Sequence, residues 1–145
     1  MRSLSVMIII TGFFFYACKG TPARGLMEDI KHSDSAVVMY YHTPGDTRFF
    51  NMTRVKKIDS LAAIVKDVNT KPSPAKDSCI TQGKIYFYGK GGAVYPVYFS
   101  RSGECMTLSF IKTGEKYFTS MSKEAKDILD DMEKRVFVFP GRQAE

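Results

Sequence analysis

The residues with the most chemical potential in this 145-residue chain are three cysteines and two histidines. The cysteines are Cys18, Cys79 and Cys105, and no two of them form a C-x-x-C pair. The histidines, His32 and His42, do not stand at the spacing from a cysteine that zinc sites use. We therefore predict no metal site and no cofactor, and we expect both histidines to be solvated.

Motifs of common enzyme classes give no catalytic assignment. The sequence has no G-x-S-x-G and no H-E-x-x-H arrangement. The "GKGG" stretch at 89–92 lacks phosphate-loop spacing and leads into a strand-like segment, so we interpret it as a hairpin turn. Asp130 and Asp131 diverge on a helix and cannot act on one bond. The sequence favours a non-enzymatic protein, and an enzyme with scattered catalytic residues stays open.

The first residues of the chain predict an export signal. Arg2 is the only charged residue before Lys19. The uncharged run from Leu4 to Ala17 would extend about 21 Å as a helix, which is short of the roughly 30 Å hydrocarbon core of a bilayer. A basic start, a short apolar stretch and a small residue at its end are typical of a secretory signal peptide.

The "FYAC" stretch at 15–18 resembles the lipobox of bacterial lipoproteins, in which a small residue precedes a lipidated cysteine. Ala17 and Cys18 match this pattern, whereas the two residues before them depart from it. The resemblance implies that Cys18 begins the mature chain and carries acyl groups, palmitate among them. These would anchor the protein in a bacterial cell-envelope membrane, on the periplasmic side or at the cell surface. Ordinary cleavage after Ala23 and an uncleaved anchor remain as alternatives.

The chain is expected to divide into three parts. Residues 1–17 form the signal peptide, residues 18–33 the lipidated cysteine and a flexible tether, and residues 34–145 a single domain. The tether is predicted because its stretch contains two glycines and a proline and shows no sustained hydrophobic period.

Hydrophobic periodicity within the domain predicts an α+β fold. Strands are expected at 35–42, 47–53, 84–88, 93–100 and 105–111, because these segments are rich in β-branched and aromatic residues. Helices are expected at 59–69 and 121–135, where apolar residues recur at i, i+3, i+4 and i+7. The order ββαβββα favours a single antiparallel sheet of about five strands with both helices packed on one face.

Symmetric turns would set the register of the last three strands, with Tyr88 opposite Ala93 and Ser100 opposite Cys105. One face would then lie under the helices and carry Tyr86, Tyr95, Val97, Phe99, Met106, Leu108 and Phe110. The other would carry Ile85, Phe87, Val94, Pro96, Tyr98, Thr107 and Ser109. On this second face, Phe87, Val94 and Tyr98 form a candidate partner surface. There are alternative explanations for the apolar residues on this face. The tether or the apolar C-terminus could cover them, or they could simply be tolerated at the surface.

Cys79 and Cys105 form a candidate disulfide, because an exported chain with two remaining cysteines tends to pair them. The same register places one strand between them, and two strand spacings of about 9.6 Å exceed the reach of a bridge. Cys79 falls beyond the end of that strand, however, and the chain there can curl across to close the gap.

The formal charge of +6 comes from Lys and Arg scattered along the chain, which indicates a solvated surface rather than a nucleic-acid site. The preferred hypothesis is a non-enzymatic binding or adaptor module for another envelope protein. A small envelope hydrolase or an enzyme inhibitor is the alternative, and a structural spacer is a third reading. The sequence does not indicate an oligomeric state.

Overall fold

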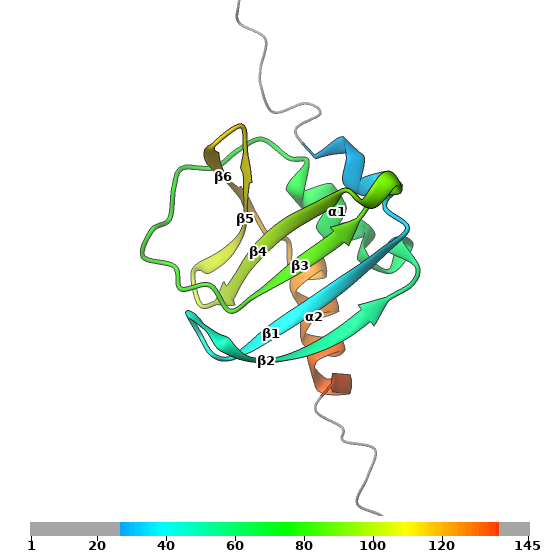
Figure 1. The fold of residues 1–145 in the computed structure, drawn as a ribbon. Coiled ribbons are helices and arrows are strands. Elements are labelled where there is room, and N and C mark those ends of the chain that lie inside the picture. The colour runs from blue at the N-terminus through cyan, green and yellow to red at the C-terminus, as the bar shows by residue number, and fades with distance from the viewer. Residues whose placement is uncertain (1–26, 137–145) are drawn as a thin grey trace, which may run out of the picture.

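The computed structural model describes residues 27–136, which form one antiparallel sheet backed by helices. The sheet has six strands in the order β2-β1-β3-β4-β5-β6. Both α-helices lie behind the same face of the sheet (Figure 1). The predicted α+β architecture is therefore confirmed, with six strands in place of about five. The signal peptide, Cys18 and the "VFVFP" stretch at 136–140 lie wholly or mostly outside the described residues.

The strands are β1 (Ser35–Thr43), β2 (Asp46–Val55), β3 (Gly83–Tyr88), β4 (Val94–Ser102), β5 (Cys105–Lys112) and β6 (Glu115–Ser120). The α-helices are α1 (Ala62–Val68) and α2 (Lys123–Val136), and the 3-10 helices are η1 (Glu28–His32), η2 (Ile58–Leu61) and η3 (Lys90–Gly92). The helix expected at 59–69 is thus a 3-10 turn that continues into α1. Among the described residues, no helix is both long and apolar enough to cross a membrane.

The strand β6 is absent from the sequence prediction. It pairs with β5 through a two-residue turn at Thr113 and Gly114, which places Lys112 opposite Glu115. Both turn residues have positive φ angles, 50° for Thr113 and 83° for Gly114. Two positive φ angles are the signature of the type I′ turn that matches the twist of a hairpin. A threonine rarely takes this conformation, so the turn was hard to identify from the sequence.

The register between β3 and β4 differs from the prediction by one residue, since Tyr88 lies opposite Val94. The connection holds five residues, with Gly91 and Gly92 both at positive φ, and the Gly89 N–H donates to the Ala93 carbonyl. A shift of one residue exchanges the two faces of a strand. The face assignments of β3 were therefore wrong, because Tyr86 points away from the helices.

The register between β4 and β5 differs from the prediction by two residues. Ser102, rather than Ser100, lies opposite Cys105. Because side chains alternate with a period of two, a two-residue shift leaves the face assignments unchanged. The residues predicted to face the helices from these strands, such as Val97, Phe99 and Leu108, do belong to the core.

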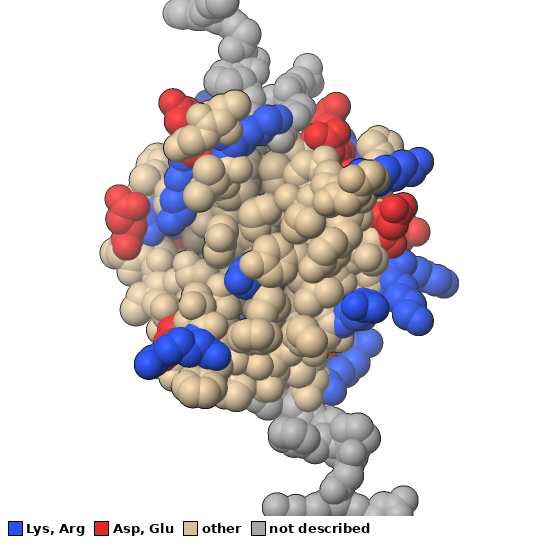
Figure 2. Space-filling model, viewed as in Figure 1, with Lys and Arg blue, Asp and Glu red and all other residues tan. Residues whose placement is uncertain are grey.

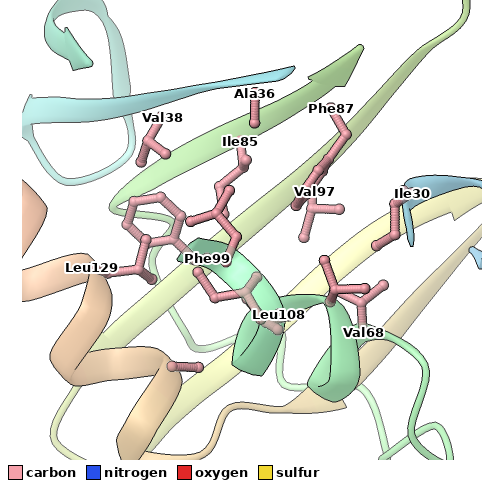
Figure 3. Packing of buried hydrophobic residues seen from close by; sticks show 14 of the residues in the cluster. Ile30, Ala36, Val38, Val68, Ile85, Phe87, Val97, Phe99, Leu108 and Leu129 are labelled. Atoms are coloured by element: carbon pink, nitrogen blue, oxygen red, sulfur yellow. The ribbon is translucent and has the colours of Figure 1, made fainter. Parts of the chain in front are cut away.

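The core lies between the sheet and the helices, where Phe87 and Phe99 pack against residues of α1 and α2 (Figure 3). Ile30 of η1 is fully buried in the same cluster, and Met27 is almost so. Residues 27–33 fall in the segment that the sequence analysis assigned to a tether. Burying a large apolar side chain such as Ile30 stabilises the folded state by about 1.5–3 kcal/mol. This segment is therefore part of the folded domain.

Polar contacts fix the start of α2 over α1. The Ser122 hydroxyl accepts a hydrogen bond from the Ala125 N–H, which makes Ser122 the capping residue. The Ser122 N–H in turn donates to the buried Asp67 carboxylate of α1 at 2.7 Å. These contacts hold the two helices together on one side of the sheet.

Candidate functional site: the open face of the sheet

The open face of the sheet is defined here as the strand positions that point away from the helices. Alternation along each strand decides which residues belong to it. Its members on the first four strands of the sheet order include Asp46, Arg48, Phe50, Met52 and Arg54 of β2, Val37, Met39 and Tyr41 of β1, Lys84, Tyr86 and Tyr88 of β3, and Val94, Pro96 and Tyr98 of β4.

One half of the open face is covered by the segment between α1 and β3. The Ser73 N–H donates to the Phe118 carbonyl of β6 at 2.8 Å, and the Ser100 hydroxyl donates to the Ile80 carbonyl at 2.8 Å. Thr107 and Phe118 are buried on this half although no helix lies over them. The segment curls around the β6 side of the sheet in Figure 1.

A disulfide ties this covering segment to the sheet. Cys79 and Cys105 are joined, with their Cα atoms 5.4 Å apart. Nearby, the Lys76 ammonium donates to the Glu104 carbonyl at 3.2 Å and the Gln82 amide donates to the Ser102 hydroxyl at 2.6 Å. The predicted pairing of the two cysteines is thus present, and it occurs where the chain passes the end of β4.

The other half, called the exposed half below, spans β2, β1, β3 and β4 and carries large apolar side chains in contact with solvent. Met52 is 63% exposed, Val94 47%, Phe50 40% and Tyr88 37%. Figure 2 views the molecule from this side, where uncharged atoms fill most of the centre and charged residues lie mainly around the rim. An apolar surface bounded by charges is typical of an interaction site.

Of the three residues proposed for a partner surface, two have the predicted face and one does not. Val94 and Tyr98 lie on the exposed half, as expected. Phe87 is 0% exposed and points into the core, so its assignment to a partner surface was wrong. The cause is the one-residue register shift between β3 and β4, which places Tyr86 and Tyr88 on the open face in its place.

The centre of the exposed half holds a group of polar aromatic residues around one lysine. This tyrosine cluster consists of Tyr41, Lys84, Tyr86 and Tyr98. Lys84 lies directly opposite Tyr98 in the sheet, and its ammonium is 4.7 Å from the centre of the Tyr86 ring. A side-chain hydrogen bond with Tyr86 raises the pKa of Lys84, so the lysine stays cationic. Burial raises the pKa of Tyr41, which therefore keeps its phenolic proton.

The open face carries an excess of positive charge. The strand positions that face away from the helices include Arg54, Lys84 and Lys116, and no ion pair joins these three to an acid within residues 27–136. Asp46 is the acid on the same face of β2, and it is paired with Arg48 at 2.7 Å. A partner that docks here would gain from acidic side chains around an apolar centre.

Two open grooves of about 510 Å³ each lie at the edges of the helix layer. One separates β2 from α2 and contains Asp131, whose carboxylate accepts a hydrogen bond from Arg135. The other lies beside α1 and is lined by residues such as Ile58 and Val65. Within residues 27–136, no group of three or more His, Cys, Asp or Glu side chains is placed to hold a metal ion.

Phe50, Met52, Lys84 and Tyr86 lie on the exposed half and were not predicted there from the sequence. His32 and His42, the two histidines of the chain, are exposed and lie outside the tyrosine cluster. The sequence did contain a signal for the β2 contribution, since Phe50 and Met52 alternate with polar residues.

Comparison of the chain with family models, curated proteins and solved structures finds no match.

Proposed function

We propose that this chain is a non-enzymatic binding module that docks another protein on the exposed half of its open face. The observation that carries this proposal is the exposure of Phe50, Met52, Tyr88 and Val94 on a sheet face that no helix covers. Burying such side chains lowers the free energy by about 25 cal/mol for each Å² of apolar surface removed from water, which favours association with an apolar partner surface.

The partner that fits this surface is a protein with an apolar centre and acidic side chains around it. The cations Arg54 of β2 and Lys84 of β3 lie on the exposed half and have no acidic partner within residues 27–136. Charges at such positions steer association and fix orientation more than they add affinity. The apolar contacts would therefore supply affinity, and these two cations would select the partner.

The proposed location is the bacterial cell envelope, with the domain anchored through acyl groups on Cys18. This part rests on the resemblance of "FYAC" at 15–18 to a lipobox. The partner would then be another envelope protein within reach of the membrane. Growth with radiolabelled palmitate should label the wild-type protein, and Cys18→Ser should abolish the label. Persistence of the label in that variant would contradict the anchor.

Photocross-linking in intact cells tests the docking surface. The full chain would carry p-benzoylphenylalanine at Tyr98 on the exposed half, and the control would carry it at Glu124, which is exposed on α2. We expect a discrete protein adduct from Tyr98 and none from Glu124. Tyr88→Glu added to the Tyr98 probe should remove the adduct, because it buries a charge in the contact. No adduct, or equal adducts from both positions, would contradict the proposal.

A further inference from the structure

The tyrosine cluster has a feature that the packing of this chain does not explain. The Tyr41 side chain is only 7% exposed, and its hydroxyl has no hydrogen-bond partner among the described residues. Buried hydroxyls are normally hydrogen-bonded, because an unpaired one loses its contacts with water and gains nothing in return. An acceptor supplied from outside the chain would complete this group.

The neighbours of Tyr41 indicate what kind of acceptor fits. Lys84 is close enough for its charge to act on the Tyr41 hydroxyl, and so are the phenol groups of Tyr86 and Tyr98. Lys84 has no acidic partner within residues 27–136, and aromatic side chains surround it. The position combines one cation on an apolar surface with one unpaired hydroxyl donor buried beside it.

This combination matches a carboxylate better than a phosphate. A carboxylate carries one negative charge and two acceptor oxygens, which one ammonium and one phenol can satisfy together. A phosphate carries more charge and usually needs several cations or backbone N–H groups. The ring of Tyr86, two residues along β3 from Lys84, and the ring of Tyr98, opposite Lys84 on β4, would contact the apolar stem that carries the carboxylate.

We infer that Lys84 and the Tyr41 hydroxyl bind a carboxylate side chain of the docked protein, held between the rings of Tyr86 and Tyr98. This inference rests on the proposed function and adds the chemistry of one central contact. A single acidic residue on an otherwise apolar partner surface would enter the cluster. Such a contact rejects partners without the acid, since they would leave the ammonium desolvated without a counter-ion and the hydroxyl without an acceptor.

Phenylacetate is a suitable probe because it joins a carboxylate to an apolar ring. The full chain would be placed in phosphatidylcholine nanodiscs with 13C in its lysine ε and tyrosine ζ carbons. We expect saturable shifts of the Lys84 and Tyr41 signals at millimolar phenylacetate, the range of about 4 kcal/mol binding. Phenylacetamide, which has the same shape without the charge, should produce no such shifts.

Substitutions identify the residues responsible. Lys84→Gln should weaken phenylacetate binding by about tenfold or more, which is about 1.4 kcal/mol. Tyr41→Phe should weaken it less, and Lys116→Gln, which removes a cation from an outer strand of the same face, should leave it unchanged. Equal shifts with phenylacetamide, unchanged binding by Lys84→Gln, or no saturable shift with phenylacetate would overturn the inference.

The cross-linking experiment separates this inference from the proposed function. Lys84→Gln introduced beside the photoreactive group at Tyr98 should reduce the protein adduct. An adduct that forms as strongly in Lys84→Gln as in the wild type would overturn the carboxylate contact and support the docking surface. Phenylacetate binding through Lys84 without any adduct in cells would overturn the docking surface and support the carboxylate site alone.

Discussion

The Tyr40 hydroxyl donates a hydrogen bond of 2.9 Å to the Leu129 carbonyl, which joins β1 to α2 across 89 residues of sequence. Both side chains are buried, and the ring of Tyr40 also contacts Phe99 edge-on with centroids 5.7 Å apart. The Arg101 guanidinium lies 5.2 Å from the centre of the Tyr40 ring and pairs with Asp130 and Glu133 of α2. These contacts fix the helix layer on its side of the sheet.

Tyr40→Phe should lower the free energy of unfolding by about 1–2 kcal/mol, because it removes one hydrogen bond and leaves a buried carbonyl without it. Urea-induced unfolding followed by circular dichroism would measure the change. Tyr117→Phe is the control, since its hydroxyl donates to Glu115 at an exposed site. A Tyr40→Phe protein as stable as the control would show that the Leu129 contact contributes little.

The stability of the protein should decline in alkali through Tyr40. Burial raises the pKa of Tyr40 above its ordinary value, so the folded state keeps the phenol neutral where the unfolded chain ionises it. This stabilisation is fully present below the unfolded pKa of about 10 and is lost as pH rises toward the folded pKa, at about 1.4 kcal/mol per pH unit.

Unfolding measurements between about pH 8 and pH 10.5 would detect this effect, since the unfolded pKa of tyrosine is about 10. The free energies of unfolding of the wild type and Tyr40→Phe should differ most near pH 8, and this difference should become smaller above pH 10. The other tyrosines are common to both proteins and cancel in the comparison. A gap that stays constant over the range would contradict a raised pKa for Tyr40.

The face assignments of β3 can be checked with a pair of alanine substitutions. Phe87→Ala should destabilise the fold by about 3–5 kcal/mol, because it leaves a cavity between the sheet and the helices. Tyr86→Ala should cost less, since Tyr86 is half-buried on the open face. The free energies of unfolding from urea titrations give the comparison. A larger loss for Tyr86→Ala would support the register that we first expected.

Local patterns were enough to predict most of the elements. The period of Leu61, Ile64, Val65 and Val68 predicted the first helix, and the β-branched and aromatic residues of 35–42 and 47–53 predicted the first two strands. The β6 strand was missed because the turn at Thr113 depends on a positive φ that threonine seldom adopts. The burial of Ile30 was missed because it depends on a pocket that distant parts of the chain create.

The candidate site was predicted less well, for a related reason. Val94 and Tyr98 were placed on the correct face because side chains along β4 alternate between the two faces. The two-residue error in the β4–β5 register does not change which face a residue belongs to. Lys84 and Tyr86 were missed because the β3–β4 connection holds one residue more than the four of the "GKGG" turn, and the sequence does not specify that count. The free hydroxyl of Tyr41 could not be foreseen, since it depends on neighbours from several strands.

Loss of the disulfide should loosen the segment over the β5 and β6 half of the open face. Cys79 and Cys105 are 26 residues apart, and closing a loop of this length stabilises a fold by about 3 kcal/mol in the chain-entropy description. Cys79→Ser with Cys105→Ser should lower the unfolding free energy by that amount and raise amide hydrogen exchange at Ser73, whose N–H is hydrogen-bonded to the Phe118 carbonyl.

Thiol titration of the protein isolated from cells is the companion measurement for the disulfide. Before reduction, Cys79 and Cys105 should give no free thiol, whether or not denaturant is present. After reduction they should give two. The Cys79→Ser, Cys105→Ser protein should still give the Tyr98 adduct, because the bridge lies at the covered half. Two free thiols in the untreated protein would contradict the bridge in the cell.

Gly83 occupies a position where any side chain should disrupt the sheet. A Cβ atom there would lie 2.2 Å from the Met39 carbonyl oxygen and 2.3 Å from Cζ of Phe99. Because both neighbours are fixed in the sheet and the core, Gly83→Ala should destabilise the fold by about 3 kcal/mol. Gly103→Ala is the matched control, since a Cβ at Gly103 meets nothing within 4 Å. Its positive φ of 56° should cost only about 1–2 kcal/mol. Urea unfolding of both variants measures the difference, and a smaller loss for Gly83→Ala than for Gly103→Ala would contradict the close packing of β3 between β1 and β4.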